Sequence, residues 1–200
     1  MCSSDLFDGE LADQVLRDEQ RVNRFEVDID RELSGIIALR QPTARDLRLL
    51  ISISRIIANL ERAGDEAART ARVVKRLLDV GIAARLRLPV NDLQFEAEMA
   101  VDLLRKALDS FARLDALGAL ELIKQDRQID SEFEGLLRKL ITYMMEDPRT
   151  ITSCIDLVFV AKAVERIGDH AKNLAEAVIY VVKGTDVRHS PVAAVEDVVG

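Results

Sequence analysis

The sequence predicts an all-α protein built from two related helical units in tandem. Three observations predict this fold: apolar residues recur at every third or fourth position over long stretches, helix-breaking residues are rare, and one acidic motif occurs twice. The 200 residues include 9 Gly, 4 Pro and no Trp, while 48% are hydrophobic. This balance is typical of long amphipathic helices.

The first unit is expected to span residues 1–84 and to contain two helices. Its first helix lies between Leu11 and Ile37 and ends near Pro42, because proline cannot continue a helix. The apolar stripe of this helix consists of Leu11, Val15, Val22, Phe25, Ile29, Leu33 and Ile36.

The second helix is expected to begin at Thr43 and to end at Gly81. The Thr43 side chain can accept a hydrogen bond as an N-cap, with Asp46 three residues on, and glycine favours the left-handed C-cap. Its apolar series consists of Leu50, Ile53, Ile57, Leu60, Ala67, Val74 and Leu78. Residues 82–91 follow as a linker.

The second unit is expected to span residues 90–184 and to contain three helices. Its first helix should be capped by Asn91 or Asp92 and end near Leu117, with a break at Gly118. The apolar stripe of that helix consists of Phe95, Met99, Leu103, Ala107, Phe111 and Leu114.

The next helix is expected to run from Ala119 to Met145. Asp147 and Pro148 then supply an N-cap and a first helical residue for the last helix, which should end at Gly184. The apolar series of the last helix consists of Ile155, Val158, Val164, Ile167, Leu174 and Val178. Residues 185–200 are rich in turn and polar residues, and we expect a flexible tail there.

Charge and cysteine content narrow the possible function classes. A net charge of -7 disfavours nucleic acid as a partner, because phosphate backbones are bound by clustered Lys and Arg. Cys2 and Cys154 have no metal-type spacing and suit a reducing cytoplasm. No uncharged run approaches the roughly 20 residues of a membrane span, and Met1 to Leu6 does not resemble a signal peptide. We expect a cytoplasmic protein.

The chain contains an internal duplication. When residues 60–71 are aligned with residues 164–175, the acidic motif and its surroundings coincide. The identical pairs are Glu61 with Glu165, Arg62 with Arg166, Gly64 with Gly168, Asp65 with Asp169, Ala67 with Ala171 and Ala71 with Ala175. Pro42 and Pro148 also precede corresponding helices, so the likeness extends over whole helical hairpins.

Each copy of the motif places two carboxylates on one face of a helix. Glu61 with Asp65, and Glu165 with Asp169, are four residues apart and should repel each other by about 0.2–0.5 kcal/mol. A compensating cation is therefore expected, either a metal ion or a basic side chain. Ligands that are all oxygen favour magnesium, manganese, calcium or iron over a thiolate-type zinc site.

A less specific interpretation stays open, because charged helices generate this spacing freely. The same spacing joins Glu26 with Asp30, Asp92 with Glu96 and Asp126 with Asp130, so the carboxylates could form a solvated or arginine-paired face. Gly64 and Gly168 strengthen the site hypothesis. Each lies in mid-helix at a cost of about 1 kcal/mol relative to Ala, which indicates a close helix approach or a nearby ligand.

At these residues the chain resembles the PhoU family, the regulators of bacterial phosphate uptake. The similar segments are LRQPTARDL at 39–47, YMMEDPR at 143–149, ERAGDEA at 61–67, ERIGDHAKNLAE at 165–176 and GTDVRH at 184–189. The resemblance implies two tandem three-helix bundles whose acidic motifs hold metal ions such as iron, zinc, manganese or magnesium. The ligands it implies are Glu61, Asp65, Glu165, Asp169, Asp126 and Asp130. Glu19 and Asn23 occupy the places in the first unit that correspond to Asp126 and Asp130 in the second.

The resemblance also implies a regulatory role. It implies an adaptor between the ATPase of the phosphate ABC transporter and a sensor histidine kinase, acting as a negative regulator without enzymatic activity. The first bundle is expected to lack its N-terminal helix, which would expose an apolar stripe and favour a homodimer. Arg69, one turn from Asp65, is expected to neutralise the first acidic pair.

The alternatives are a di-metal carboxylate enzyme and a helical scaffold. A di-metal carboxylate enzyme usually adds Glu-x-x-His motifs, which neither histidine provides, and the chain has no glycine-rich phosphate loop and no nucleophile with a matching base. A helical scaffold without metal is the remaining alternative. His170 is interpreted either as a polar surface residue or as a ligand.

Overall fold

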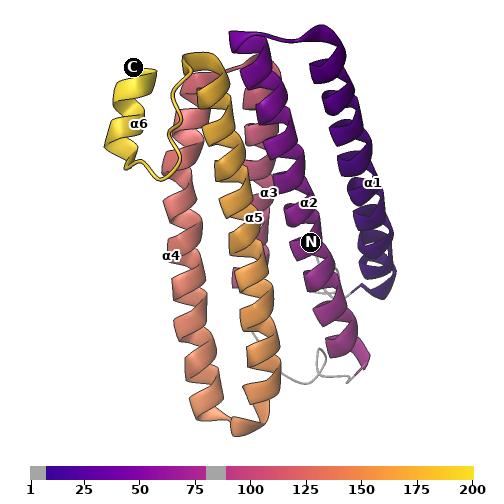
Figure 1. Ribbon diagram of the computed structural model, residues 1–200. Helices are drawn as coiled ribbons and strands as arrows, with labels where there is room; N and C mark the ends of the chain where they lie inside the picture. Colours follow the sequence, from indigo (N-terminus) through magenta and orange to yellow (C-terminus); the bar gives the residue numbers. More distant parts are fainter. Residues whose placement is uncertain (1–7, 80–88) are drawn as a thin grey trace.

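The computed structural model describes residues 8–79 and 89–200, and confirms the all-α prediction. The helices are α1 (Gly9–Arg40), α2 (Ala44–Asp79), α3 (Val90–Arg113), α4 (Ala116–Glu146), a 3-10 turn η1 (Pro148–Thr150), α5 (Ile151–Lys183) and α6 (Val192–Val199). The five long helices lie side by side along a common direction (Figure 1). None of the helices in these two ranges is long and apolar enough to span a membrane.

Helix α5 is the centre of the molecule. It packs against α2, α3 and α4. Because α3 also packs against α4, the helices α3, α4 and α5 form a three-helix bundle. Its mean hydropathy is the highest of the five long helices, and many of its residues, including Leu174 and Val178, are fully buried. The core therefore follows α5 from end to end.

Helix α1 has α2 as its only helical neighbour in the described part of the chain (Figure 1). Only Ala12 and Leu33 of its 32 residues are buried. Leu11, Phe25 and Ile36, which the sequence assigns to its buried stripe, are exposed. These side chains are uncovered because, among the described residues, α1 packs against α2 alone.

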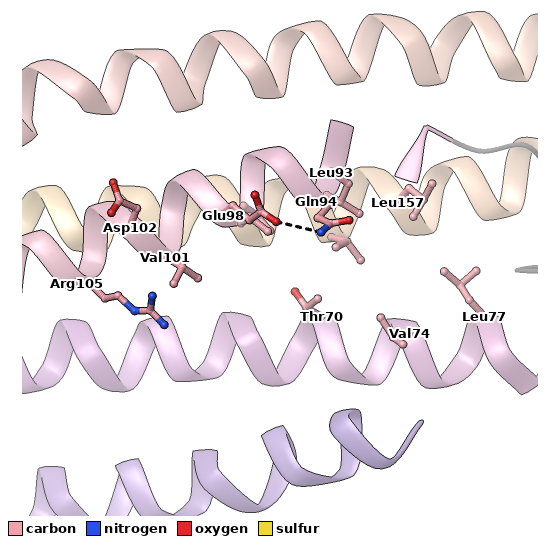
Figure 2. Close-up of a pocket in the computed structure, with 13 residues that line it drawn as sticks. Thr70, Val74, Leu77, Leu93, Gln94, Glu98, Val101, Asp102, Arg105 and Leu157 are labelled. Atoms are coloured by element: carbon pink, nitrogen blue, oxygen red, sulfur yellow. Dashed lines mark hydrogen bonds between the residues drawn. The ribbon is translucent and has the colours of Figure 1, made fainter. Parts of the chain in front are cut away.

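An apolar groove of about 500 Å³ runs between α2 and α3. Figure 2 shows Thr70, Val74 and Leu77 on α2 facing Leu93 and Val101 on α3 across it. An adjoining hollow of about 300 Å³ extends the groove towards α1. Apolar side chains of α2, α3 and α5 are therefore left partly uncovered along this groove.

Several helix ends agree with the sequence analysis. Gly184 ends α5 with a φ of 77°, in the left-handed region where glycine carries no Cβ penalty. Asp147 accepts a hydrogen bond from the backbone N–H of Arg149, and Pro148 opens the turn that leads into α5. The expected C-cap at Gly81 and most of the expected linker lie outside the described residues.

The break between α3 and α4 lies four residues before the expected Gly118. Leu114 takes a left-handed conformation with φ 52°, and Asp115 caps α4 by accepting a hydrogen bond from the N–H of Gly118. Gly118 is therefore a residue of the first turn of α4. A left-handed non-glycine residue leaves no simple signal in the sequence, so the boundary was misplaced.

The N-termini of α2 and α3 also differ in detail. At the start of α2, the Asp46 N–H donates to the backbone carbonyl of Thr43, rather than to its side chain. Pro89 precedes α3 without a side-chain cap, so neither Asn91 nor Asp92 takes that role. Both are one-turn differences that leave the helices in the expected places.

The C-terminal segment differs from the flexible tail expected at residues 185–200. Residues Val192–Val199 form α6, which packs against α4 and α5, and Val187, Val195 and Val199 are buried there. The Lys183 ammonium donates to the Val199 carbonyl at 2.8 Å. The sequence signal was weak because these short apolar residues need a tertiary partner to form a helix.

We expect Val195→Asp to release α6, because the new carboxylate would lie where the side chain is 1% exposed. Limited trypsin digestion should then cleave faster after Lys183 and Arg188, with α1 to α5 intact by circular dichroism. Ala193→Asp is the matched control, since Ala193 is exposed on the same helix. Equal cleavage rates in the two variants would contradict the docking of α6.

Candidate metal centre

The second acidic motif lies at the contact between α4 and α5. Asp169 is half-buried, and its pKa is raised by burial and then by the charges of Glu165 and Asp126. The pKa of Asp130 is raised by burial and then by Asp126 and Glu165. The four predicted ligands of the second unit therefore share one electrostatic neighbourhood, as expected for side chains from two adjacent helices.

Two lysines neutralise part of this cluster. The Lys172 ammonium donates to Asp126 Oδ2 at 2.8 Å, and the Lys162 ammonium donates to Glu165 Oε1 at 2.6 Å. The Asp126 side chain is only 3% exposed, so this pair lies in the contact between the helices. Over residues 8–79 and 89–200, no three acidic, histidine or cysteine groups are already placed to hold a metal ion.

The donor chemistry still suits a hard cation. All four groups are carboxylates, and Glu165 Oε2 is buried without a hydrogen-bond partner in the described part of the chain. The Glu165 side chain is 12% exposed, so it points into the helix contact more than outward. Metal binding here would require Lys162 and Lys172 to move away, because their ammonium groups occupy two of the ligands.

The first acidic motif is more open. Glu61 has a pKa raised by burial, then by the charges of Asp65 and Glu26, and Asp65 is exposed. On α1, the Asn23 amide donates to Glu19 Oε1 at 2.7 Å. The carboxylates of α1 and α2 therefore face each other much as those of α4 and α5 do.

The sequence analysis expects Arg69 to neutralise the pair formed by Glu61 and Asp65, but the structure pairs Arg69 with another residue. Its guanidinium forms an ion pair with Glu66 at 2.8 Å. Glu66 is 3% exposed and also pairs with Arg166 of α5 at 2.9 Å. Arg69 therefore pairs with Glu66, three residues before it on α2, and not with Asp65, four residues before it.

The two motif glycines both lie at close helix contacts. A Cβ on Gly64 would lie 3.8 Å from Val22 of α1, and one on Gly168 would lie 3.0 Å from Ile129 of α4. A distance of 3.0 Å is tighter than an ordinary Cβ contact, and Ile129 is buried, so it has little room to move aside. Close helix packing thus accounts for Gly168, while Gly64 has room for a methyl group.

This difference gives a matched pair of variants. Gly64→Ala should raise the free energy of unfolding by up to about 1 kcal/mol, because alanine is the better helix former and the methyl group fits. Gly168→Ala should lower it by about 1 kcal/mol through overpacking against Ile129. Urea denaturation measures both, and a stabilised Gly168→Ala protein would contradict the close contact.

The sequence analysis missed a polar contact between α2 and α5. His170 is buried, and its Nδ1 lies 3.0 Å from Asn59 Oδ1, which also accepts from the Asn173 amide at 2.9 Å. An amide oxygen only accepts, so Nδ1 carries the proton. The pKa of His170 is lowered by burial and then by the charges of Arg166 and Arg62. The interpretation of His170 as a surface residue is therefore wrong.

Comparison with known proteins identifies the family. The model of the PhoU domain matches residues 5–74 and 95–178. The chain belongs to the PhoU family. These two segments carry the two copies of the acidic motif and flank residues 80–88, which are among those the structure does not describe.

Named relatives of this PhoU family chain are similar over most of its length. The phosphate-specific transport system accessory protein PhoU homolog of Burkholderia sp is 49% identical over 91% of this chain and 77% of its own length. The phosphate-specific transport system accessory protein PhoU of Escherichia coli (strain K12) is 43% identical over 91% of this chain and 74% of its own length.

Solved PhoU structures share the fold. The crystal structure of PhoU from Pseudomonas aeruginosa superposes with a TM-score of 0.85 at 43% identity, covering 89% of this chain and 84% of that one. The phosphate transport system regulatory protein PhoU from Streptococcus pneumoniae gives a TM-score of 0.81 at 26% identity, with 90% and 83% covered.

Proposed function

We propose that this PhoU family protein regulates phosphate uptake and phosphate-starvation signalling. It would act in the cytoplasm as an adaptor between the ATPase of the phosphate ABC transporter and the sensor histidine kinase, as a negative regulator. The observation that carries this proposal is the similarity over 91% of the chain to proteins named as accessory to phosphate-specific transport. The helical surface of α1, exposed over most of its length, supports an adaptor role.

The adaptor role can be tested in the bacterium that carries the gene. Deletion should derepress phosphate-starvation genes in phosphate-rich medium, and the tagged chain should retain the transporter ATPase and the kinase in a pull-down. Complementation with the intact gene is the control. Retention of neither partner, together with unchanged gene expression, would refute the proposal.

Metal binding by the second acidic site forms part of the proposal. Glu165, Asp169, Asp126 and Asp130 would be the principal ligands, with Glu61 and Asp65 forming a second site on the first unit. The mutual electrostatic effects of these carboxylates and the unpaired Glu165 Oε2 support this assignment.

Asp169→Ala should lower the metal content of the purified protein, because it removes a carboxylate from the centre of the cluster. Elemental analysis after exposure to Mn²⁺ and removal of excess metal gives the metal content. Glu134→Ala is the control, since Glu134 lies on α4 in an exposed pair with Arg138. A metal content equal to that of the unsubstituted protein would refute the ligand assignment.

A scaffold without metal is the second candidate, and the two lysine pairs favour it. Lys162 and Lys172 already balance two of the carboxylates, so the cluster can exist without a metal ion. Protein purified without chelators and free of bound iron, zinc, manganese and magnesium would support the scaffold over the metal-binding form.

A homodimer is also part of the proposal. The exposed apolar residues of α1, among them Phe25 and Ile36, and the apolar groove beside α2 support self-association. Light scattering of the purified chain should give twice the monomer mass, and Phe25→Glu should shift it towards the monomer. A monomer at all concentrations would refute this part.

A further inference from the structure

Glu96 is a buried acid on α3 outside the predicted ligand set. Its side chain is 1% exposed, and neither carboxylate oxygen has a hydrogen-bond partner among the described residues. Its neighbours along the same face of α3 are Leu93, Ala100 and Leu103, all of them buried. A carboxylate in such surroundings is costly unless something compensates its charge.

The charges that bear on Glu96 are negative. Burial, and then the charges of Glu165 on α5 and Glu132 on α4, raise its pKa to about 8. Glu165 has one oxygen bonded to Lys162, while its other oxygen, Oε2, is buried without a partner. Two side chains from α3 and α5 thus bring three unpartnered carboxylate oxygens into one part of the interior.

Glu165 links this interior position to the acidic cluster between α4 and α5. It lies one helical turn before Asp169, and its charge raises the pKa values of both Asp169 and Asp130. The same side chain also acts on Glu96. Ala97, next to Glu96, and Val164, next to Glu165, line the same two hollows, so these stretches of α3 and α5 lie side by side.

We propose that Glu96 is an interior ligand of the cation bound by the second acidic site. The cation would lie between the carboxylates of Glu96 and Glu165 and would join α3 to α5, in addition to the ligands from α4. A hard divalent cation such as Mn²⁺ fits, because every donor is a carboxylate oxygen and three of these oxygens are buried without a hydrogen-bond partner among the described residues. This inference rests on the metal binding proposed above.

The two acidic sites should therefore differ in affinity. In the first unit, Glu61 and Asp65 face only α1, because no third helix packs there in the described ranges. The described residues of the first unit therefore provide no helix in the position of α3, from which a counterpart of Glu96 could come. The second site has one more carboxylate and is more enclosed, so it should bind the cation more tightly.

The test is a titration of the purified full chain with Mn²⁺, followed by electron paramagnetic resonance of the free ion. Glu96→Gln keeps the shape but removes the charged ligand, and it should weaken the tighter binding step at least about tenfold. Glu98→Gln is the matched control on the same helix, because Glu98 is exposed and bonded only to Gln94. It should bind Mn²⁺ as the unsubstituted protein does.

Thermal unfolding with and without Mn²⁺ provides a second readout that does not depend on the free-ion signal. The rise in Tm on adding Mn²⁺ should be smaller in Glu96→Gln, while circular dichroism should show an unchanged fold. Tight Mn²⁺ binding that Asp169→Ala weakens and Glu96→Gln leaves unchanged would overturn this inference alone. An unsubstituted protein that binds no Mn²⁺ would overturn the metal-binding proposal as well, without bearing on the adaptor role.

Discussion

Lys172→Met should lower the free energy of unfolding by about 3 kcal/mol, the largest loss expected from a single substitution described here. Asp126 is 3% exposed, and Lys172 is its ion-pair partner at 2.8 Å. Removing one member of a buried pair leaves an uncompensated charge, which typically costs about 3–5 kcal/mol. The lower end applies because the Lys172 side chain is 35% exposed.

Urea denaturation of two further proteins isolates the orphaned charge as the cause. Lys172→Met combined with Asp126→Asn should recover most of the lost stability, since the charge is then removed together with its partner. Lys139→Met removes a surface pair with Asp92 and should cost much less than Lys172→Met, because exposed ion pairs contribute little to stability. Equal losses in Lys172→Met and Lys139→Met would contradict the buried pair between α4 and α5.

Glu96→Met should have the opposite sign and raise the free energy of unfolding by about 1–3 kcal/mol. Methionine has nearly the same shape as glutamate and leaves no buried polar atom, whereas both Glu96 oxygens lack hydrogen-bond partners within residues 8–79 and 89–200. Glu98→Met, at an exposed position on the same helix, should change stability by less than about 0.5 kcal/mol.

The gain from Glu96→Met should grow with pH. Because burial raises the pKa of Glu96 from 4.5 to about 8, the folded protein holds a proton that the unfolded chain releases. The unfolded state binds fewer protons in this window, so the stability of the unsubstituted protein falls as pH rises between these values. Urea denaturation at pH values across this window should show a steady gain in the variant, and a gain independent of pH would contradict the raised pKa.

The sequence predicted the long helices well because periodicity and helix ends are local. Pro148 and Gly184 marked the limits of the last long helix, and the structure has Pro148 at the start of the 3-10 turn before α5 and Gly184 at the C-cap of α5. Helix α6 was missed because Val195 and Val199 are stable in a helix only against α4 and α5. The spacing of apolar residues along the chain does not show such a contact between distant segments.

The candidate site was predicted less completely, for the same reason. The spacing of Glu165 and Asp169 placed them on one helix face, but the pair between Lys172 of α5 and Asp126 of α4 depends on how these two helices pack. Glu96 could have been found from the sequence. It interrupts the apolar spacing of Leu93, Ala100, Leu103 and Ala107, and the structure buries that stripe.

Phe95 marks the error that hid Glu96. The sequence analysis began the stripe of α3 at Phe95 and Met99, each one position before the buried Glu96 and Ala100. It was right further along the helix, where Leu103 and Ala107 are buried. Phe95 is 50% exposed. The prediction favoured Phe95 because of its large apolar side chain. In the structure, the close packing of α3 against α5 buries small residues such as Ala100 and Ala107 instead.

The attachment of α1 through one neighbour has a consequence for how the molecule opens. Among the described residues, detaching α1 breaks only its interface with α2, whereas displacing α5 would disrupt the interfaces with α2, α3, α4 and α6. Regions with few buried contacts open first, at a free energy below that of global unfolding. Fluctuations in which α1 swings off α2 are therefore the least costly large motion, and they leave the carboxylates of α3, α4 and α5 in register.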